Sequence, residues 1–541
     1  MENSLYTKNK VIRICSAVAV YLLALLYAII AVGSIVQTSH IDPANPYSEK
    51  ITFDSDLIFT NLALIGLSVM AALTMMRKHI EISRLNTRFI VGVMLLFTTV
   101  LSLAWVNMVR SVPSGDSMTL LNTAKSASQG NFGNLVNSGA SYGNHSYFDF
   151  YPNELGFVLF EQLFYTVFGS GTSALVFQII NVIALDAVYI GLVMIVKYAF
   201  DRPSVTNLSA ILLTLFLQPM FITTYVYSYL IGLSFIVWAI CFALRFMKEN
   251  KLLYAGLGVL TAALGYMIRP EYMVILIAVC IALVLHAVDR KKWLSIAMAA
   301  LMVFCAFGAQ KLVVAGYRSA SGGKLNTHLS STVKRYAGIS ESGMAPGWYN
   351  AVDFNTLLGS NMDMKAADES AKLGIKERTQ SLSASRRTVE FFKEKLLSQI
   401  NEPTFQSIWL SQVREHDLPT NEKLSPIVES VYTGGLKLLL DNWFHYFNMM
   451  VLLFSSAGMI WLILRKALCP QTLILPLSVT GGILYHMLYE AKSQYMLPYF
   501  IFLIPLAAYG MIESTKAIYF LFKKIKSKLN KETEKAPVET E

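Results

Sequence analysis

A polar segment between two apolar stretches carries the residues best suited to chemistry. Residues 111–154 include Gly115-Asp116 and end in Asp149-Phe-Tyr-Pro-Asn-Glu154. A carboxylate such as Asp116 can act as a general base for an acceptor hydroxyl. It can equally be a turn or helix-cap residue, because Pro113-Ser-Gly-Asp116 has the composition of a turn. On these residues alone, both interpretations stay open.

Asp149, Tyr151 and Glu154 combine carboxylates with aromatic rings. This combination suits a sugar, whose apolar faces stack on rings while its hydroxyl groups donate to carboxylates. The alternative is structural, because Pro152-Asn153 can begin a helix and the neighbouring aromatic residues can form a membrane-interface belt. The composition favours neither interpretation.

Further charged groups follow two later apolar runs. Arg269 and Glu271 lie at the end of one, and Glu490 and Lys492 lie at the end of another. An arginine on the side of a membrane that is poor in positive charge needs a partner. That partner could be Glu271 or Glu490, or an anionic ligand such as a lipid phosphate, which a guanidinium binds through two hydrogen bonds. Lys492 has the same two interpretations.

The elements that must position these groups are membrane helices. The chain has 541 residues, of which 54% are hydrophobic and 15% are charged, and its mean hydropathy is +0.48. A soluble protein of this size could not cover so much apolar surface. Repeated apolar runs of about twenty residues indicate helical spans, since the strands of a β-barrel would alternate. The predicted fold class is therefore an all-α polytopic membrane protein.

The chain contains about twelve predicted spans, whose ends group by charge. They are 11–35, 57–76, 89–109, 173–197, 204–220, 229–246, 252–268, 271–289, 293–315, 443–465, 471–490 and 496–515. Connections rich in lysine and arginine alternate with connections poor in both. The positive-inside rule therefore puts both termini in the cytoplasm and the polar loops outside, in a multi-pass plasma-membrane protein. The net charge of +10 is topology information and does not indicate a nucleic-acid partner.

These spans divide the chain into five parts. We expect an N-terminal two-span addition at 1–88, a membrane core at 89–315 with a first outer loop at 110–172, a helical extracytoplasmic insertion at 316–440, C-terminal spans at 441–515, and a basic, then acidic cytoplasmic tail at 516–541. Residues 154–168 are apolar but short, and Glu161 interrupts them, so an interfacial helix fits them better than a crossing. The insertion is expected to be amphipathic and helical at 365–400. The tail after residue 522 is expected to be disordered.

The unusual polar residues lie far apart in sequence but at the same, outer ends of the predicted helices. If the helices pack together, these ends frame one cavity at the lipid–water boundary. Asp186 is different because it lies inside a span, where we interpret it as a neutral or hydrogen-bonded group. The histidines show no metal-ligand spacing, so no metal site is predicted, although carboxylates could still hold a divalent cation.

Several short motifs, taken in order, resemble those of the GT-C superfamily of integral-membrane glycosyltransferases. They are the Gly-Asp loop after an early span, Tyr147-Phe-Asp-Phe-Tyr-Pro-Asn-Glu-Leu-Gly156, Gly265–Pro270, Gly343-Met-Ala-Pro-Gly-Trp-Tyr-Asn350 followed by Asp353, and Tyr489-Glu-Ala-Lys-Ser-Gln-Tyr-Met-Leu-Pro498. The resemblance covers roughly residues 89–515. It is closest to the bacterial branch related to protein O-mannosyltransferases and aminoarabinose transferases.

The resemblance implies a polyprenyl-phosphate-linked sugar as donor and a glycan or lipid hydroxyl as acceptor on the outer face. It maps the catalytic base to Asp116 and the donor phosphate to Arg269, with Lys492 second. The other predicted substrate-binding residues are Asp149, Tyr151, Glu154, Glu271 and Glu490. Relatives often have arginine where this chain has Gln494, so either Lys492 supplies that charge or this part of the site differs.

Two other classes of protein stay open. A transporter or flippase of lipid-linked saccharides would need polar residues through the bundle, whereas these spans are mostly apolar. A polysaccharide polymerase or ligase would also act on the outer face, with a diphosphate-linked oligosaccharide as donor. We expect the transferase, with a cell-envelope glycopolymer as acceptor.

Overall fold

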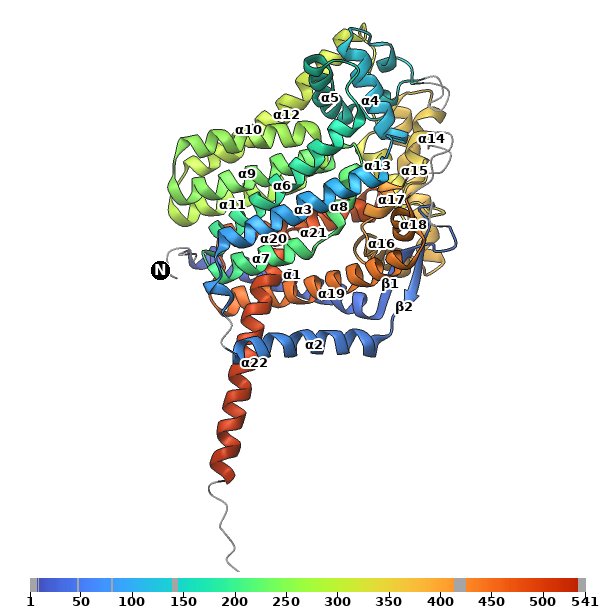
Figure 1. Ribbon diagram of the computed structural model, residues 1–541. Helices are drawn as coiled ribbons and strands as arrows, with labels where there is room; N and C mark the ends of the chain where they lie inside the picture. The colour runs from blue at the N-terminus through green and yellow to red at the C-terminus, as the bar shows by residue number, and fades with distance from the viewer. Residues whose placement is uncertain are drawn as a thin grey trace, which may run out of the picture.

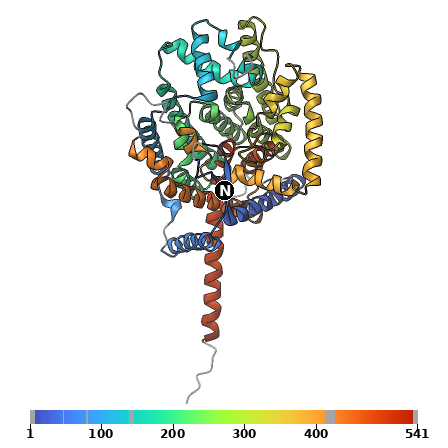
Figure 2. The ribbon, with the colours of Figure 1, turned by 90° about the vertical axis from the view of Figure 1, so that its right-hand side faces the viewer.

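The computed structural model describes residues 7, 9–45, 48–78, 81–138, 145–412 and 425–533. Long helices lie side by side in a bundle (Figure 1). Helices α13–α18 gather at one end of this bundle, which we call the site end, and α1 (Lys10–Val36) begins at the opposite end. Figure 2 shows the molecule from the site end.

Eight helices in the described part of the chain are long and apolar enough to cross a membrane. They are α1 (Lys10–Val36), α2 (Ile58–Arg77), α3 (Thr87–Val109), α6 (Ala174–Phe200), α9 (Ser228–Glu249), α11 (Met273–Arg290), α12 (Leu294–Ala320) and α19 (Gly435–Leu464). Helices α3, α6, α9 and α11 each end at a residue in the left-handed conformation, a common way to stop a helix. The chain is an all-α polytopic membrane protein, as predicted.

The other four predicted spans are helical but less regular. Two of them are bent pairs, which raise the number of possible spans to ten: α7 (Pro203–Leu215) with α8 (Gln218–Phe221) and η6 (Ile222–Thr224), bent by 48°, and α21 (Ser493–Phe500) with α22 (Leu503–Thr533), bent by 56°. Helix α10 (Leu252–Ile268) has only 17 residues. Helix α20 (Pro470–Leu488) contains Pro476 and is not among the eight.

Short helices at the site end follow α3. They are α4 (Gly115–Ser128), η2 (Gly133–Leu135), η4 (Tyr147–Asp149), η5 (Pro152–Glu154) and α5 (Leu155–Phe168). A further turn, η7 (Pro270–Tyr272), joins α10 to α11. Helix α5 is the segment that we expected to be interfacial, and its 14 residues are too few to cross a bilayer.

The insertion is helical, as expected. Its helices are α13 (Ser331–Ile339), α14 (Val352–Gly359), α15 (Met364–Ala384), α16 (Thr388–Ile400), α17 (Ser407–Ser411) and α18 (Pro426–Tyr432). The amphipathic stretch predicted at 365–400 forms two helices, α15 and α16, because the chain turns at Ser385–Arg387.

A β-hairpin joins α1 to α2, and the sequence did not predict it. Strands β1 (Gln37–Ile41) and β2 (Ile51–Ser55) pair antiparallel, with Gln37 opposite Ser55 and Ile41 opposite Ile51. Helix α1 packs against the C-terminal spans, where the Ser456 hydroxyl donates to the Ala24 carbonyl. The predicted N-terminal addition is therefore part of the bundle, and η1 (Ile82–Arg84) connects it to α3.

Basic connections meet at the end of the bundle opposite the site end. Arg202 and Arg465 both pair with Glu513, at 3.1 and 2.8 Å. Lys248 pairs with Asp201 in the same region. The predicted disorder after residue 522 is wrong in part, because α22 continues to Thr533 and projects from the bundle (Figure 1). Lysine has a high helix propensity, so the lysine-rich segment can continue the helix of the preceding apolar span. Residues 534–541 lie outside the described part.

Candidate functional site

A polar cavity of about 790 Å³ opens at the site end. Seven of the eight predicted site residues line it: Asp116, Tyr151, Glu154, Arg269, Glu271, Glu490 and Lys492. They come from four separate parts of the chain, including two connections between membrane helices. The packing of the helices therefore brings together groups that are distant in sequence.

The eighth residue, Asp149, is used to cap a short helix. One of its carboxylate oxygens accepts a hydrogen bond from the Ser146 amide at 3.1 Å, and the Ser146 hydroxyl in turn accepts one from the Phe148 amide. Asp149 is not among the residues that line the cavity. Asp186, which we interpreted as hydrogen-bonded, accepts from the hydroxyl groups of Thr98 and Thr99 at 2.9 and 2.6 Å.

Asp116 stands at the start of α4. Gly115 has a φ of 55°, which glycine adopts without strain, and the helix begins at that residue. The amide groups of a first helical turn favour a negative charge. The Asp116 side chain is exposed to the cavity, but protein atoms surround it on the other sides, and the resulting desolvation raises its pKa. The positive charge of Lys492 and a hydrogen bond from Tyr147 oppose that rise and favour the carboxylate.

Glu154 is a buried carboxyl group that is only partly satisfied. Its Oε1 accepts from the side-chain amide of Asn153 at 2.9 Å, whereas its Oε2 has no hydrogen-bond partner among the described residues. Burial, reinforced by the charge of Glu271, raises the pKa of Glu154 to about 8. The group is therefore mostly protonated at neutral pH.

A close helix contact sets the position of Glu154. A Cβ atom on Gly156 would lie 1.7 Å from the carbonyl oxygen of Met267. Only glycine allows α5 to approach the end of α10 so closely. This contact brings Glu154 near Arg269, whose charge lowers the pKa of Glu154 against the effect of burial.

Arg269 projects from the end of α10 and is nearly enclosed. Its Nη1 donates to the Ser228 hydroxyl at 2.8 Å, and its Nε lies 3.6 Å from a Glu271 oxygen. The guanidinium carbon lies 3.9 Å from the centroid of the Tyr229 ring, a favourable cation–π distance. Aromatic and polar contacts thus orient the guanidinium, and its pairing with Glu271 is loose.

Three tyrosines beside Arg269 form one aromatic wall. Tyr225, Tyr227 and Tyr229 all line the cavity, and neighbouring ring centroids are 5.3 and 5.5 Å apart. The backbone is extended at Tyr225 and Tyr227, so alternate side chains share a face. Our reading of the sequence missed this wall, although the alternation Tyr225-Val-Tyr-Ser-Tyr229 was a usable signal.

The connection between α20 and α21 supplies Glu490 and Lys492. The Tyr495 hydroxyl donates to Glu490 Oε1 at 3.0 Å. Burial raises the pKa of Glu490 to about 7, and the charge of Lys492 opposes the rise. Glu490 can therefore change its protonation near neutral pH, at the edge of the cavity.

A buried lysine holds this connection in place. Lys395 Nζ donates to the carbonyl oxygens of Gly338, Met487 and Tyr489. Burial lowers the pKa of Lys395 to about 7. A Cβ atom on Gly338 would lie 2.6 Å from the carbonyl carbon of Tyr489, so α13 also packs directly on the connection. The insertion therefore braces the loop that carries Glu490.

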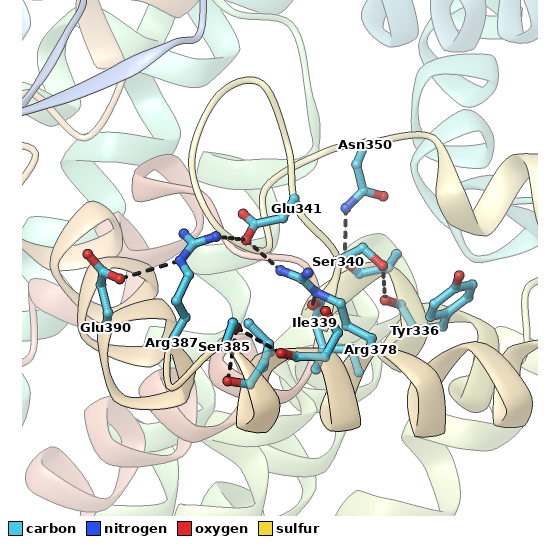
Figure 3. A network of polar contacts seen from close by, with 12 residues as sticks. Tyr336, Ile339, Ser340, Glu341, Asn350, Arg378, Ser385, Arg387 and Glu390 are labelled. Atoms are coloured by element: carbon cyan, nitrogen blue, oxygen red, sulfur yellow. Dashed lines mark hydrogen bonds and ion pairs between the residues drawn. The ribbon is translucent and has the colours of Figure 1, made fainter.

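The insertion also contributes to the cavity wall. Lys334, Tyr349 and Asp353 line it. Figure 3 shows how Glu341, at the start of the 340–351 loop, accepts from both Arg378 and Arg387. These ion pairs fasten the loop that carries Tyr349 to α15 and to the following turn.

Glu49, between the strands of the N-terminal hairpin, is another cavity residue that sequence reasoning missed. Its carboxylate pairs with Lys492 at 2.8 Å. A single glutamate in a short polar connection shows no pattern, so the sequence offered no signal for it. The N-terminal two-span addition thus supplies a charged group to the cavity.

Six carboxyl groups and three cations line the cavity, together with nine tyrosines. The carboxyl groups are Glu49, Asp116, Glu154, Glu271, Asp353 and Glu490, and the cations are Arg269, Lys334 and Lys492. No group of three or more His, Cys, Asp or Glu among the described residues could hold a metal ion. The arrangement can bind a polyhydroxylated molecule, hold an anion at Arg269 and accept a proton at Asp116.

The fold and this cavity define a polytopic integral membrane protein with a polar cavity at one end of its helix bundle. The chain belongs to the family described as conserved hypothetical integral membrane proteins, whose family model matches residues 7–515. A comparison with curated proteins finds no match.

Proposed function

We propose that the protein is a glycosyltransferase of the GT-C type. It would move a sugar from a polyprenyl-phosphate donor to an acceptor hydroxyl on the outer face of the membrane. The observation that carries this proposal is the single cavity shared by a carboxylate at a helix N-terminus, Asp116, and an aromatic-bound guanidinium, Arg269. A base and an anion-binding group on one sugar-sized cavity are what such a transfer requires.

The proposed reaction balances without a nucleotide. Asp116 takes the proton from the acceptor hydroxyl as its oxygen bonds to the anomeric carbon. The bond from that carbon to the phosphate oxygen breaks, and the polyprenyl phosphate leaves with the electron pair, stabilised by Arg269. Attack opposite to the leaving group inverts the anomeric centre. The tyrosine wall beside Arg269 would stack against the apolar face of the sugar.

The protonation states of the carboxyl groups suit these roles. Glu154 and Glu490 have raised pKa values of about 8 and about 7, so both can donate hydrogen bonds to the substrate in their protonated form. Protonation also limits the negative charge that an incoming phosphate would meet. Asp116 is the carboxyl group whose surroundings include Lys492 and a helix N-terminus, which favour the ionised form.

Replacement of Asp116 tests the proposal directly. The Asp116→Asn variant keeps the size of the side chain but cannot accept the proton, so transfer from a polyprenyl-phosphate sugar should fall at least about a hundredfold. Purified protein in lipid nanodiscs would be assayed with labelled donor, with thermal unfolding as the folding control. Near-normal transfer by this variant would remove Asp116 as the base.

The donor chemistry separates the competing functions. A polymerase or ligase would use a diphosphate-linked oligosaccharide and ignore the monophosphate donor. A flippase would move labelled lipid across vesicles without forming a new glycosidic bond. The transferase is favoured because the polar lining gathers at one end of the bundle, whereas a transport path needs polar groups along its length.

A further inference from the structure

The ion pair between Glu49 and Lys492 has the geometry of an occupied anion site. Lys492 Nζ lies 2.8 and 2.9 Å from the two carboxylate oxygens of Glu49. Gln406 Nε2 donates to Glu49 Oε1 at 3.1 Å. The side chains of Lys492 and Glu49 are only 11% and 10% exposed. The ammonium of Lys492 therefore holds both carboxylate oxygens at the cavity wall, and the buried amide of Gln406 holds one of them.

The hairpin that carries Glu49 is fastened by other contacts. The Ile51 amide donates to the Met344 carbonyl at 3.0 Å, and the Asn401 side chain donates to the Gln37 carbonyl at 3.1 Å. Ile51 also packs in an apolar cluster with Trp348. Release of the Glu49 side chain would therefore leave the hairpin attached to the insertion.

The negative charge of the cavity favours a phosphate that replaces the Glu49 carboxylate on Lys492 over one that binds beside the intact ion pair. Carboxyl groups outnumber cations in its lining by six to three. A phosphate that entered while Lys492 stayed paired would add negative charge next to Glu49 without gaining a free cation. If the carboxylate of Glu49 turns away, the phosphate oxygens can take its place on Lys492 and Gln406.

We propose that Glu49 occupies, in the ligand-free protein, the place of phosphate oxygens on Lys492 and Gln406, and that the substrate phosphate, which Arg269 also binds, displaces it. This inference rests on the proposed function, which assigns phosphate binding to the same cavity. In this inference Lys492 contacts the phosphate directly. Glu49 competes with anions for Lys492 and so sets their affinity and selectivity.

The test measures binding of an unsubstituted polyprenyl phosphate to the full-length protein in nanodiscs made of neutral lipid. Glu49→Gln should bind it about tenfold more tightly than the wild type, because the competing carboxylate is gone. Glu49→Asp keeps the charge and serves as the matched control, with affinity near that of the wild type. Inorganic phosphate in a parallel titration distinguishes a lipid headgroup from free phosphate.

A double-mutant cycle assigns the effect to Lys492. In a Lys492→Met background, Glu49→Gln should no longer tighten binding. Unchanged or weaker binding by Glu49→Gln, with the wild-type unfolding temperature retained, would overturn the inference while leaving the proposed function intact. If the wild-type protein binds no polyprenyl phosphate at all, the proposed function fails as well.

Discussion

The two ends of the helix bundle differ in the ratio of cations to carboxyl groups. At the end where α1 begins, three cations surround one carboxylate, because Arg202, Arg465 and Lys516 all lie within 3.3 Å of Glu513. At the site end, six carboxyl groups face three cations, and Glu154 keeps an oxygen without a hydrogen-bond partner among the described residues. The first arrangement compensates the buried carboxylate, whereas the second leaves buried carboxyl groups with fewer cations than they need and costs folding free energy. Such a costly arrangement is typical of a functional site.

Arginine substitutions at the two ends should separate activity from stability most strongly. Arg269→Met should lower sugar transfer by at least about a hundredfold, because the leaving phosphate loses its cation. Arg202→Met should lower the unfolding temperature and keep the transfer rate of the folded protein. Initial rates and thermal unfolding of both variants in one detergent would make the comparison.

Arg269→Lys refines this prediction. A lysine keeps the charge but loses the planar group that stacks on Tyr229, so partial activity is expected. Equal losses of transfer in Arg269→Met and Arg202→Met would erase the proposed distinction between the two ends.

Glutamate substitutions at the two ends should differ in their effect on stability. Glu513→Gln leaves three cations without their carboxylate and should lower the free energy of unfolding by about 3 kcal/mol. Glu154→Gln replaces a carboxyl group that is already mostly protonated, and should leave the stability of the ligand-free protein unchanged or slightly higher. Denaturant unfolding of both variants at neutral pH measures the difference. A large loss of stability in Glu154→Gln would show that this carboxyl group is structural.

The pH dependence of stability should differ in a Glu490 variant. The pKa of Glu490 is about 7 in the folded protein and has an ordinary value of 4.5, so the folded state binds more protons between these values. The contribution of Glu490 to the free energy of unfolding therefore falls as pH rises from 4.5 to 7. Glu490→Gln should reduce this fall by about 1 kcal/mol, since water in the cavity screens the charge. Unfolding temperatures at pH 5 and pH 8 test the sign.

The smallest effect is expected at Asp149. Its carboxylate caps η4 outside the cavity, so Asp149→Ala should cost about 1 kcal/mol of stability. The transfer rate of the folded variant should stay within about twofold of the wild type. A larger loss of transfer would return Asp149 to the substrate-binding set that its sequence context suggested.

Several elements were predictable because their signals are local. The length of the apolar runs predicted the membrane spans. The short apolar run that Glu161 interrupts predicted α5 as a separate helix too short to be a span. The charged residues next to helix ends predicted Arg269 and Glu490 as neighbours of one cavity. The continuation of α22 to Thr533 was missed, because composition suggested disorder where a long helix simply extends.

Other features of the site have no local signal. Asp149 and Asp116 look alike in sequence, but backbone geometry turns one into a cap and the other toward the cavity. The tyrosine wall needed both its alternation and the extended backbone before α9. The hairpin was missed because β1 is a short, mostly polar strand in a chain dominated by apolar helices.

The sequence by itself determined the class of protein and the common side of its polar groups, because hydrophobic length and charge placement act over one span at a time. Only the tertiary structure decided which of these groups meet. Glu49 and Lys492 are 443 positions apart and pair only when α1 packs beside the C-terminal spans and the insertion fastens the hairpin. Packing also decided which carboxyl groups are buried and protonated, since burial depends on every element around them.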